Sequence, residues 1–464
     1  MERFFHIKAR GSAVRTEMMA GLTTFMTMGY ILMVNAGIFS TFGDGYYNAV
    51  YLATAISAVI GTVLVGLLAN LPLAQAPGMG LNAFFVYTVC GGLGFTYANA
   101  LVFVLVDGLV FLVLTVTGLR RMIFEAIPKT IRMAIPAGIG LFIAFLGFQD
   151  AGLIVPNEST GVSLASFNLL GGRTWADIMP LLVTLAALAV IAVLSARGVK
   201  GAILWGILGG TLLYDVFGFT IPGFYDGFFG GFAFHPFAAF GDFAALSFGK
   251  VFTEGFDFSA YLAGHTTLEL VISLITTSLA FCMVDMFDTL GTLYGACARG
   301  GMLDENGDVP NMERAMLADA VATTTGSICG TSTVTTFVEA SAGIAEGGRT
   351  GLAALVTAAL FFLSMFFASI ASLIPSSATA AALIYVGILM MSGVKDIEWN
   401  DPAVAVPAFL AIAMMPFTYN ISYGIAFGIL SYIVIHVFIG NSKKVNVGTW
   451  IIGILFAAMF LLTH

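Results

Sequence analysis

The chain carries very little charge for its length. Of its 464 residues only 9% are Asp, Glu, Lys or Arg, whereas 59% are hydrophobic, and the mean hydropathy is +0.98. A water-soluble protein cannot cover such a composition with polar surface, whereas a protein that crosses the lipid bilayer many times requires it. No stretch is polar enough for a separate soluble domain, and we expect no nucleic-acid partner.

Cysteine and histidine are also scarce. The five histidines fall mostly at the ends of predicted spans or in loops, which disfavours a histidine proton relay. The sequence shows no nucleotide-binding loop and no nucleophile–base or metal constellation. We therefore expect neither an enzyme nor a cofactor or metal site. The four cysteines lack the spacing of metal ligands or of a disulfide framework; they are Cys90, Cys282, Cys297 and Cys329.

Three acidic residues interrupt segments that otherwise are typical of membrane spans. Asp285 and Asp288 are one helical turn apart in LAFCMVDMFDTLGTLYG, and Glu339 follows a Ser/Thr-rich break in GTSTVTTFVEASAG. A carboxylate in hydrocarbon is costly, so one that is kept there usually faces a cavity and handles a substrate or a proton. The pattern indicates a transport site.

Apolar windows long enough to span a bilayer, roughly 17–25 residues, recur along the whole chain. Lys and Arg mark cytoplasmic loops, and their alternation with acidic or neutral connections predicts about fourteen crossings with the N-terminus inside. The basic N-terminus has no small-residue cleavage site, so we expect no removable signal peptide. The apolar segment 446–463 is left over, and the sequence does not decide whether it crosses the membrane or lies in the interface. Candidate spans centre near residues 30, 60, 85, 108, 140, 186, 209, 278, 320, 341, 361, 385, 409 and 430.

Two of these candidate spans are too irregular for a continuous helix. LPLAQAPGMGLNAFFVYTV (71–89) has prolines and glycines before its apolar half, and GSICGTSTVTTFVEASAG (326–343) has a β-branched and glycine-rich run where a helix should begin. Each predicts an extended piece followed by a half-helix, which is tolerated at membrane depth only where it is buried in protein or lines a cavity. A pair of broken segments at matching positions of two halves points to a transporter site.

The two halves of the chain also resemble each other. The matching segments occur in the same order, and the offset between them falls steadily. An odd number of spans in each half makes such a repeat inverted in the membrane. The matches are ATAISAVIG (53–61) with ADAVATTTG (318–326), the segment ending at Asp150 with the segment ending at Asp396, and ILWGIL (203–208) with IAFGIL (425–430).

Three motifs together resemble the adenine/guanine/hypoxanthine permeases, the azaguanine-resistance branch of the nucleobase–cation symporters. The motifs are APGMGLNAFF (76–85), VDMFDTLGTL (284–293) and TSTVTTFVEASAG (331–343). The N-terminal RTEMMAGLTTFMTMGYILMVN (15–35) is similar to the same family, so the resemblance covers essentially the whole chain. One departure is Ala36, where the family leads us to expect proline.

The resemblance implies the uracil-permease fold, an all-α polytopic membrane protein built from two inverted repeats of seven spans. Short strands are expected in the broken third and tenth spans. The fold divides the chain into a core domain, 1–125 and 263–373, and a gate domain, 126–262 and 374–464. It further implies a multi-pass protein of the cell membrane, the inner membrane in bacteria, that can form homodimers.

The function implied by the resemblance is import of purine nucleobases by proton symport, through an elevator-like movement of core against gate. Guanine, hypoxanthine and adenine are the expected substrates. Asp285 and Glu339 match the acids that hold the base in related permeases, with Asn82 and Asp288 as supporting polar residues. The chemistry agrees, because an ionised carboxylate accepts the ring N–H and amino hydrogens of guanine side by side.

Apolar and backbone groups complete the predicted site. Phe337 and either Phe84 or Phe85 would wall a slot for the flat base, and the N–H groups of Phe337 and Val338 would meet its acceptors. Adenine accepts at the edge where guanine donates, so it requires either a protonated carboxyl group or a flipped pose, and burial favours the neutral form of a carboxyl group. We therefore expect Asp288 or Asp285 to exchange a proton while Glu339 grips the substrate.

Other interpretations stay open at this point. Asp107 and Asp319 are also intramembrane acids, but neither adjoins a broken segment, and we expect structural roles for both. An anion transporter of the same fold would require cationic or neutral half-helix starts, which Glu339 disfavours. A channel is disfavoured because broken-helix repeats fit alternating access. The sequence decides neither between protons and sodium ions as the coupled cation nor the order of preference among purines.

Overall fold

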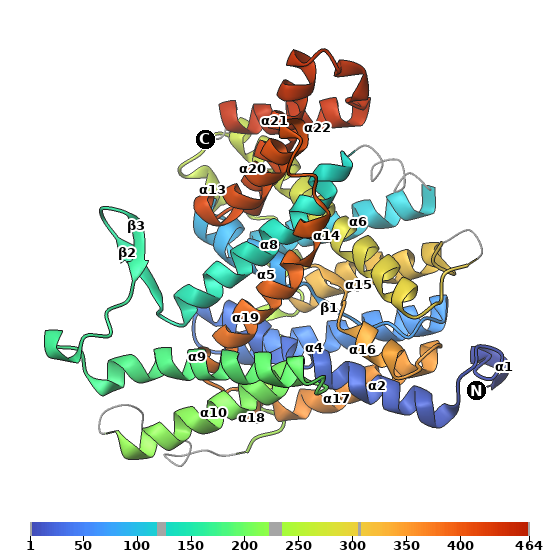
Figure 1. Ribbon diagram of the computed structural model, residues 1–464, viewed down its shortest axis with the longest axis vertical. Coiled ribbons are helices and arrows are strands. Elements are labelled where there is room, and N and C mark those ends of the chain that lie inside the picture. The colour runs from blue at the N-terminus through green and yellow to red at the C-terminus, as the bar shows by residue number, and fades with distance from the viewer. Residues whose placement is uncertain (1, 118–126, 222–233, 305–307, 463–464) are drawn as a thin grey trace.

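The computed structural model describes residues 2–117, 127–221, 234–304 and 308–462 (Figure 1). Within these ranges the chain is almost entirely helical, and ten helices are long and apolar enough to cross a membrane. The chain is therefore a multi-pass membrane protein, as its composition predicts. The ten are Val14–Phe42, Tyr46–Ala69, Tyr97–Thr117, Lys129–Asp150, Trp175–Ala196, Ala202–Thr220, Thr267–Ala298, Gly351–Ala371, Ser376–Asp396 and Ile421–Phe438.

Four of the predicted spans fall on shorter or more polar segments, so the count of about fourteen crossings stays a prediction. These are the half-helix Met79–Gly92, α15 (Met312–Cys329), α16 (Ala340–Ala345) and α20 (Pro402–Thr418). The leftover segment 446–463 forms α22 (Val447–Leu462), which packs against α14 (Thr267–Arg299) and α21 (Ile421–Phe438).

Both irregular segments contain the short strands that the sequence predicts. Strand β1 (Gln75–Pro77) pairs antiparallel with β4 (Val334–Thr336), so that Gln75 lies opposite Thr336. A short helix follows each strand, α5 (Met79–Ala83) after β1 and α16 after β4. All six strand residues are buried, so the broken backbone lies inside protein, where it is tolerated at membrane depth.

The connection between α15 and β4 depends on a glycine. Gly330 ends α15 with φ +93°, a left-handed conformation that residues with a Cβ adopt only with strain. A Cβ at this position would lie 2.6 Å from Tyr97 Oη. The Tyr97 hydroxyl donates to the Gly330 carbonyl at 2.6 Å, which fixes the point where the chain leaves α15 for the strand.

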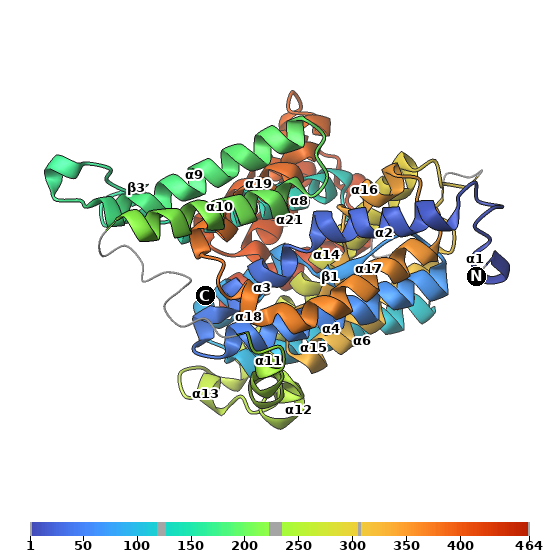
Figure 2. The same cartoon turned by 90° about the horizontal axis from the view of Figure 1, so that it is seen from below.

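The helices pack in two groups, which Figure 2 shows on opposite sides of the molecule. One group contains α8, α9, α10, α19, α20 and α21, with bounds Lys129–Asp150, Trp175–Ala196, Ala202–Thr220, Ser376–Met390, Pro402–Thr418 and Ile421–Phe438. The other contains α2, α3, α4, α6, α15 and α17, with bounds Val14–Met28, Ile31–Phe39, Tyr46–Leu64, Tyr97–Thr117, Met312–Cys329 and Gly351–Ser364. The helices of the first group lie in the segments expected for the gate domain, and those of the second group lie in the segments expected for the core domain. The division into domains itself stays a prediction, and its boundary at 125/126 lies outside the described residues.

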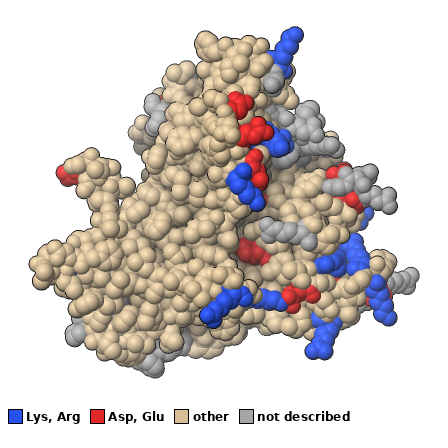
Figure 3. Space-filling view, viewed as in Figure 1, with Lys and Arg blue, Asp and Glu red and all other residues tan. Residues whose placement is uncertain are grey.

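One broad face of the molecule is almost free of charge. Figure 3 shows this face over α9 and α10, while Lys and Arg gather toward the end that carries the N-terminus. Large apolar side chains on these two helices are exposed, among them Leu185, Val193, Leu212 and Phe219. Such an apolar face is stable in contact with lipid but not in contact with water.

Candidate functional site

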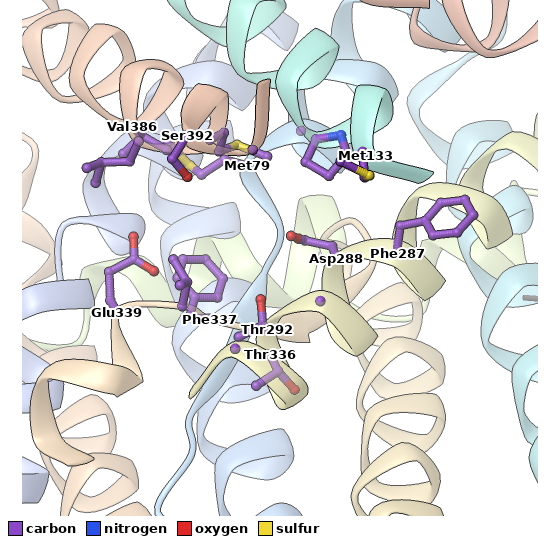
Figure 4. Close-up of a pocket in the computed structure, with 18 of the residues that line it drawn as sticks. Met79, Met133, Phe287, Asp288, Thr292, Thr336, Phe337, Glu339, Val386 and Ser392 are labelled. Carbon is purple, nitrogen blue, oxygen red and sulfur yellow. The ribbon is translucent and has the colours of Figure 1, made fainter. Parts of the chain in front are cut away.

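A cavity of about 320 Å³ lies where the two helix groups meet, beside the β1–β4 pair. Its wall combines residues of α14, β4 and α5 with residues of α8 and of α19 and the turn after it (Figure 4). This volume falls in the range of small-molecule sites, roughly 300–1,000 Å³. The polar or aromatic lining residues are Tyr30, Phe287, Asp288, Thr292, Thr336, Phe337, Glu339, Ser392 and Asp396.

Glu339 is held in the cavity wall by two contacts from the N-terminal helices. The hydroxyl of Tyr30, which lies between α2 and α3, donates to Glu339 Oε1 at 2.6 Å. The Thr27 hydroxyl donates to the Glu339 backbone carbonyl at 3.2 Å. Because one carboxylate oxygen is bound to Tyr30, the orientation of the other is fixed for a ligand.

Asp288 belongs to the same cavity. It projects from α14, and the Thr335 hydroxyl of β4 donates to its Oδ2 at 3.1 Å. Figure 4 shows Phe337 between the carboxyl groups of Glu339 and Asp288, with Val386, Ser392 and Met79 above them. Two carboxyl groups and an aromatic ring thus face one space, which suits a flat ligand with hydrogen-bond donors on its rim.

Four of the predicted site residues line the cavity: Asp288, Phe337, Val338 and Glu339. The Phe337 N–H, however, donates to the Ala74 carbonyl at 3.0 Å and so is not available to a substrate. The expectation that this N–H meets the base is therefore wrong. It arises because the residue after β4 continues the strand pairing with the chain before β1.

The other predicted residues lie outside the cavity lining. Asn82 is buried, accepts a hydrogen bond from Ser332 and donates to the Pro77 carbonyl at 3.4 Å, so it ties the two broken segments together. Phe85 packs with its ring centroid 5.0 Å from that of Phe39. Phe84 packs at 4.8 Å from Phe281. None of these three residues lines the cavity, which α5 meets through Met79 and Gly80.

Asp285 is fully buried and is not among the residues that line the cavity. A position three residues from Asp288 on a helix faces a similar but not identical direction, and here Asp288 meets Thr335 of β4 while Asp285 meets Thr289 of its own helix. The acids expected to be structural are also buried, and the Thr333 hydroxyl donates to Asp107 Oδ2 at 2.8 Å.

Tyr30, Thr336 and Asp396 also line the cavity, although the sequence did not predict them as site residues. Tyr30 lies in the motif 15–35 and Thr336 lies in the motif 331–343. The motifs therefore include both residues, but their residue type and spacing do not distinguish them from other motif residues. Asp396 ends one of the repeat segments, and only the packing of the turn after α19 brings it to the cavity.

The charge of the cavity has one sign. Asp288, Glu339 and Asp396 are its ionisable acids, and no Lys, Arg or His stands among its described lining residues. A carboxylate-lined site attracts cations and hydrogen-bond donors and repels anions.

A second cavity of about 360 Å³ reaches Glu339 from the other side, between α9–α10 and α16, and shares Glu339 and Leu389 with the first. Near its rim Lys200, in the α9–α10 connection, forms an ion pair with Glu346 at the end of α16.

Comparisons with known sequences identify relatives of the whole chain. The model of the Xan_ur_permease family, a permease family, matches residues 15–427. The chain is 41% identical to a permease of Methanocaldococcus jannaschii, over 99% of this chain and 98% of that protein. It is 35% identical to the adenine permease AdeQ of Escherichia coli, over 100% of this chain and 96% of AdeQ. It is 37% identical to the guanine/hypoxanthine permease PbuO of Bacillus subtilis, over 97% of this chain and 98% of PbuO.

Solved structures share the fold at low sequence identity. The transmembrane domain of the cyanobacterial bicarbonate transporter BicA matches with a TM-score of 0.62 and 16% identity, over 88% of this chain and 97% of that domain. The structure of SLC26A9 matches with a TM-score of 0.61 and 13% identity, over 92% of this chain and 65% of that chain. These likenesses show the architecture and not the substrate.

Proposed function

This chain belongs to the Xan_ur_permease family of permeases, and from that premise we propose that it imports purine nucleobases together with protons. Its relatives are permeases and not enzymes, as the sequence predicts. Guanine, hypoxanthine and adenine are the proposed substrates, because two relatives of comparable identity bear the names of adenine and of guanine/hypoxanthine permeases.

The observation that carries the proposal is the Glu339–Tyr30 pair beside Asp288 in the cavity. Glu339 accepts from Tyr30 on one oxygen and presents the other to the cavity, where it can accept a ring N–H or an amino hydrogen of the base. The Phe337 ring, which is 6% exposed, offers a face for stacking. Asp285, which the sequence also assigned to substrate, is not among the lining residues, so this proposal gives it no contact with the base.

Proton exchange is proposed at Asp288. It is the α14 acid that faces the cavity, and a neutral, protonated Asp288 would donate a hydrogen bond where an ionised one accepts. The change of protonation can therefore accompany binding and release of the base. Adenine, which accepts at this edge, would bind the protonated form.

The movement proposed for transport is an elevator-like shift of one helix group against the other. The cavity has walls from both groups, α14, β4 and α5 on one side and α8 and α19 on the other, so a relative shift would change its access. We place the protein in the cell membrane, the inner membrane in bacteria, with a cytoplasmic N-terminus, about fourteen crossings and a possible homodimeric assembly.

The anion-transporter alternative has the fold in its favour, because BicA is a bicarbonate transporter of the same architecture. The three acids of the cavity oppose it, since an anion would meet carboxylates without a cationic partner among the described lining residues.

The test is uptake of radiolabelled guanine, hypoxanthine, adenine, xanthine and uracil by cells that express the wild type or Glu339→Gln. We expect purine uptake that competes among bases and falls roughly 10- to 100-fold in the variant, because the charge-assisted hydrogen bond between the base and the carboxylate is lost. Bicarbonate uptake with no base uptake would support the anion transporter instead. A proton uncoupler and sodium replacement identify the driving ion.

A matched variant tests the coupling residue. Asp288→Asn should bind purine but lose uphill, proton-driven accumulation, because the amide cannot release a proton. Retained accumulation in Asp288→Asn would remove Asp288 from the coupling role, while exchange of labelled for unlabelled base would show that the variant still folds and binds.

A further inference from the structure

A further cavity of about 380 Å³ lies between the same two helix groups as the first. Helix α8 lines the first cavity with Met133, near its start, and the further cavity with Asp150, its last residue. Helix α19 lines the further cavity with Thr379 and the first with Met390. Met133 and Asp150 are about 25 Å apart on a helix that rises about 1.5 Å per residue, so the two cavities lie toward opposite sides of the membrane.

The basic residues assign the further cavity to the outer side. The first cavity lies where Lys129 begins α8 and Lys395 stands in the turn after α19. Lys and Arg mark the cytoplasmic side of a membrane protein. Within the described part of the chain, the wall of the further cavity contains no Lys, Arg or His. In the proposed orientation it faces the cell exterior, and we call it the outer cavity.

The predicted internal repeat relates the two cavities. The segment that ends at Asp150 matches the segment that ends at Asp396. Asp396 lines the first cavity, and Asp150 lines the outer cavity. In the same alignment Pro136 corresponds to Leu383, and these residues also line the first and the outer cavity, respectively. An inverted repeat exchanges the two sides of the membrane, so it builds two related cavities, one toward each side.

The wall of the outer cavity is rich in hydrogen-bond acceptors. Five of its hydroxyl groups donate to backbone carbonyls at 2.7 to 3.1 Å, so a ligand meets their oxygens as acceptors. The exposed carboxylate of Asp150 adds a charged acceptor. Such a wall favours a ligand with N–H donors and repels anions. The five hydroxyl groups are those of Ser40, Thr41, Tyr47, Ser372 and Thr379.

Resting on the proposed function, we propose that the outer cavity is a second binding site for the transported base, occupied from outside before the base reaches Glu339. Asp150 accepts a ring N–H or amino hydrogen, and the half-buried Tyr87 offers an aromatic face. The Tyr87 ring is held by a T-shaped contact with Tyr419, 5.9 Å between centroids. The ligand class is a planar heterocycle with N–H groups on its rim, which is the class that the first cavity also fits.

An apolar layer about one helical turn thick separates the two sites. Tyr30, just before α3, lines the first cavity, and Val34, on α3, lines the outer cavity. On α19, Leu383 lines the outer cavity and Val386 lines the first. Val34 and Leu383 are buried, so the layer is closed in this structure. One helical turn is about 5 Å, so a shift of the two helix groups by about this length passes the base from one site to the other.

Cysteine labelling of the full-length protein in intact cells tests the outer site. Thr379→Cys places a thiol in the outer cavity, where a positively charged, membrane-impermeant methanethiosulfonate should reach it from outside. We expect hypoxanthine to slow this labelling. The wild type gives the background from the native cysteines.

Ser159→Cys is the matched control. Ser159 is exposed between β2 (Ile154–Asn157) and β3 (Gly161–Leu164), which follow the end of α8 that carries Asp150, and it does not line the cavity. Labelling of Ser159→Cys should proceed from outside at the same rate with and without hypoxanthine.

Two further substitutions, each combined with Thr379→Cys, separate the outer site from the first. With Glu339→Gln, protection by hypoxanthine should persist although uptake falls, because the outer site does not use Glu339. With Asp150→Asn, half-maximal protection should require about tenfold or more hypoxanthine, because a hydrogen bond to a charged group is lost. If Thr379→Cys fails to fold, Thr41→Cys at the exposed rim of the same cavity replaces it.

Protection that disappears with Glu339→Gln would overturn the proposal, because it would then report occupancy of the first cavity. Labelling of Thr379→Cys only from the cytoplasmic side, or equally with and without hypoxanthine, would overturn it as well. Hypoxanthine uptake by Thr379→Cys before labelling measures the proposed function separately. Uptake without protection removes only the outer site, whereas protection without uptake supports the outer site and contradicts the proposed function.

Discussion

At the scale of single residues, the site depends on how a carboxylate is held. Glu339 lies just before α16, and its side chain would be free to turn without the Tyr30 hydroxyl that donates to it at 2.6 Å. Tyr30 is itself fully buried between α2 and α3, so its ring cannot move aside. A rigid partner of this kind reduces the entropy that Glu339 would lose on binding the proposed base.

Replacing Tyr30 by Phe should therefore weaken binding of the base without unfolding the protein. The lost hydrogen bond to a charged group corresponds to about tenfold or more in the half-saturating base concentration. Concentration-dependent uptake measures it. Tyr51→Phe is the matched control, because the Tyr51 hydroxyl donates at 3.0 Å to the Ser364 carbonyl, away from the cavity. Equal effects of both substitutions would contradict a specific role for Tyr30.

At the scale of elements, the short helix α5 touches the opposite helix group at a glycine. A Cβ on Gly80 would overlap Cγ2 of Ile139 on α8, so the two elements approach as closely as glycine allows. Gly80 also lines the cavity. Close packing at this contact leaves no room for an added methyl group, and overpacking costs roughly 1–3 kcal/mol.

Gly80→Ala should consequently slow uptake more than it weakens base binding, because it obstructs the contact between the two groups. Ile139→Ala removes the atom that would overlap, so the double variant should recover most of the lost rate. Maximal uptake rates for the two single variants and the double variant, at matched expression, measure this coupling. If the losses of rate in the two single variants simply add in the double variant, Gly80→Ala does not act through its contact with Ile139.

At the scale of the whole molecule, the two helix groups are joined by an ion pair as well as by the cavity. Lys200 of the α9–α10 connection contacts Glu346 at the end of α16. The segment after α16 is fixed to its own group, because the Arg349 and Thr350 N–H groups donate to the Glu17 carboxylate at 2.9 and 3.3 Å. The pair therefore spans two bodies that the proposed elevator movement must separate.

Cross-linking the pair should stop transport. We expect the double variant Lys200→Cys/Glu346→Cys to lose uptake on oxidation and to regain it on reduction. Lys250→Cys/Glu254→Cys is the matched control, since that ion pair joins neighbouring turns of one segment. Uptake that continues in the oxidised Lys200–Glu346 cross-linked protein would exclude relative movement of the two groups at this point.

The sequence by itself determined the class of the protein and singled out the three motifs that line the cavity. Low charge and recurrent apolar windows require a membrane protein, and acids kept in such windows require a cavity or a partner. The prolines and glycines of 71–80 and the β-branched run of 331–336 exclude continuous helices. The sequence therefore also predicts the short strands β1 and β4. These are local consequences of residue type and do not depend on distant contacts.

Only the tertiary structure decided which acids share the cavity. Asp285 and Asp288 are equivalent in the sequence, but Asp288 lines the cavity and contacts Thr335 of β4, whereas Asp285 contacts Thr289, which also contacts Asp319 of α15. Tyr30 meets Glu339 across 309 positions of the chain, a distance over which no local pattern carries information. Which side chain faces a cavity depends on the angle at which distant helices pack, and that angle is set by the whole molecule.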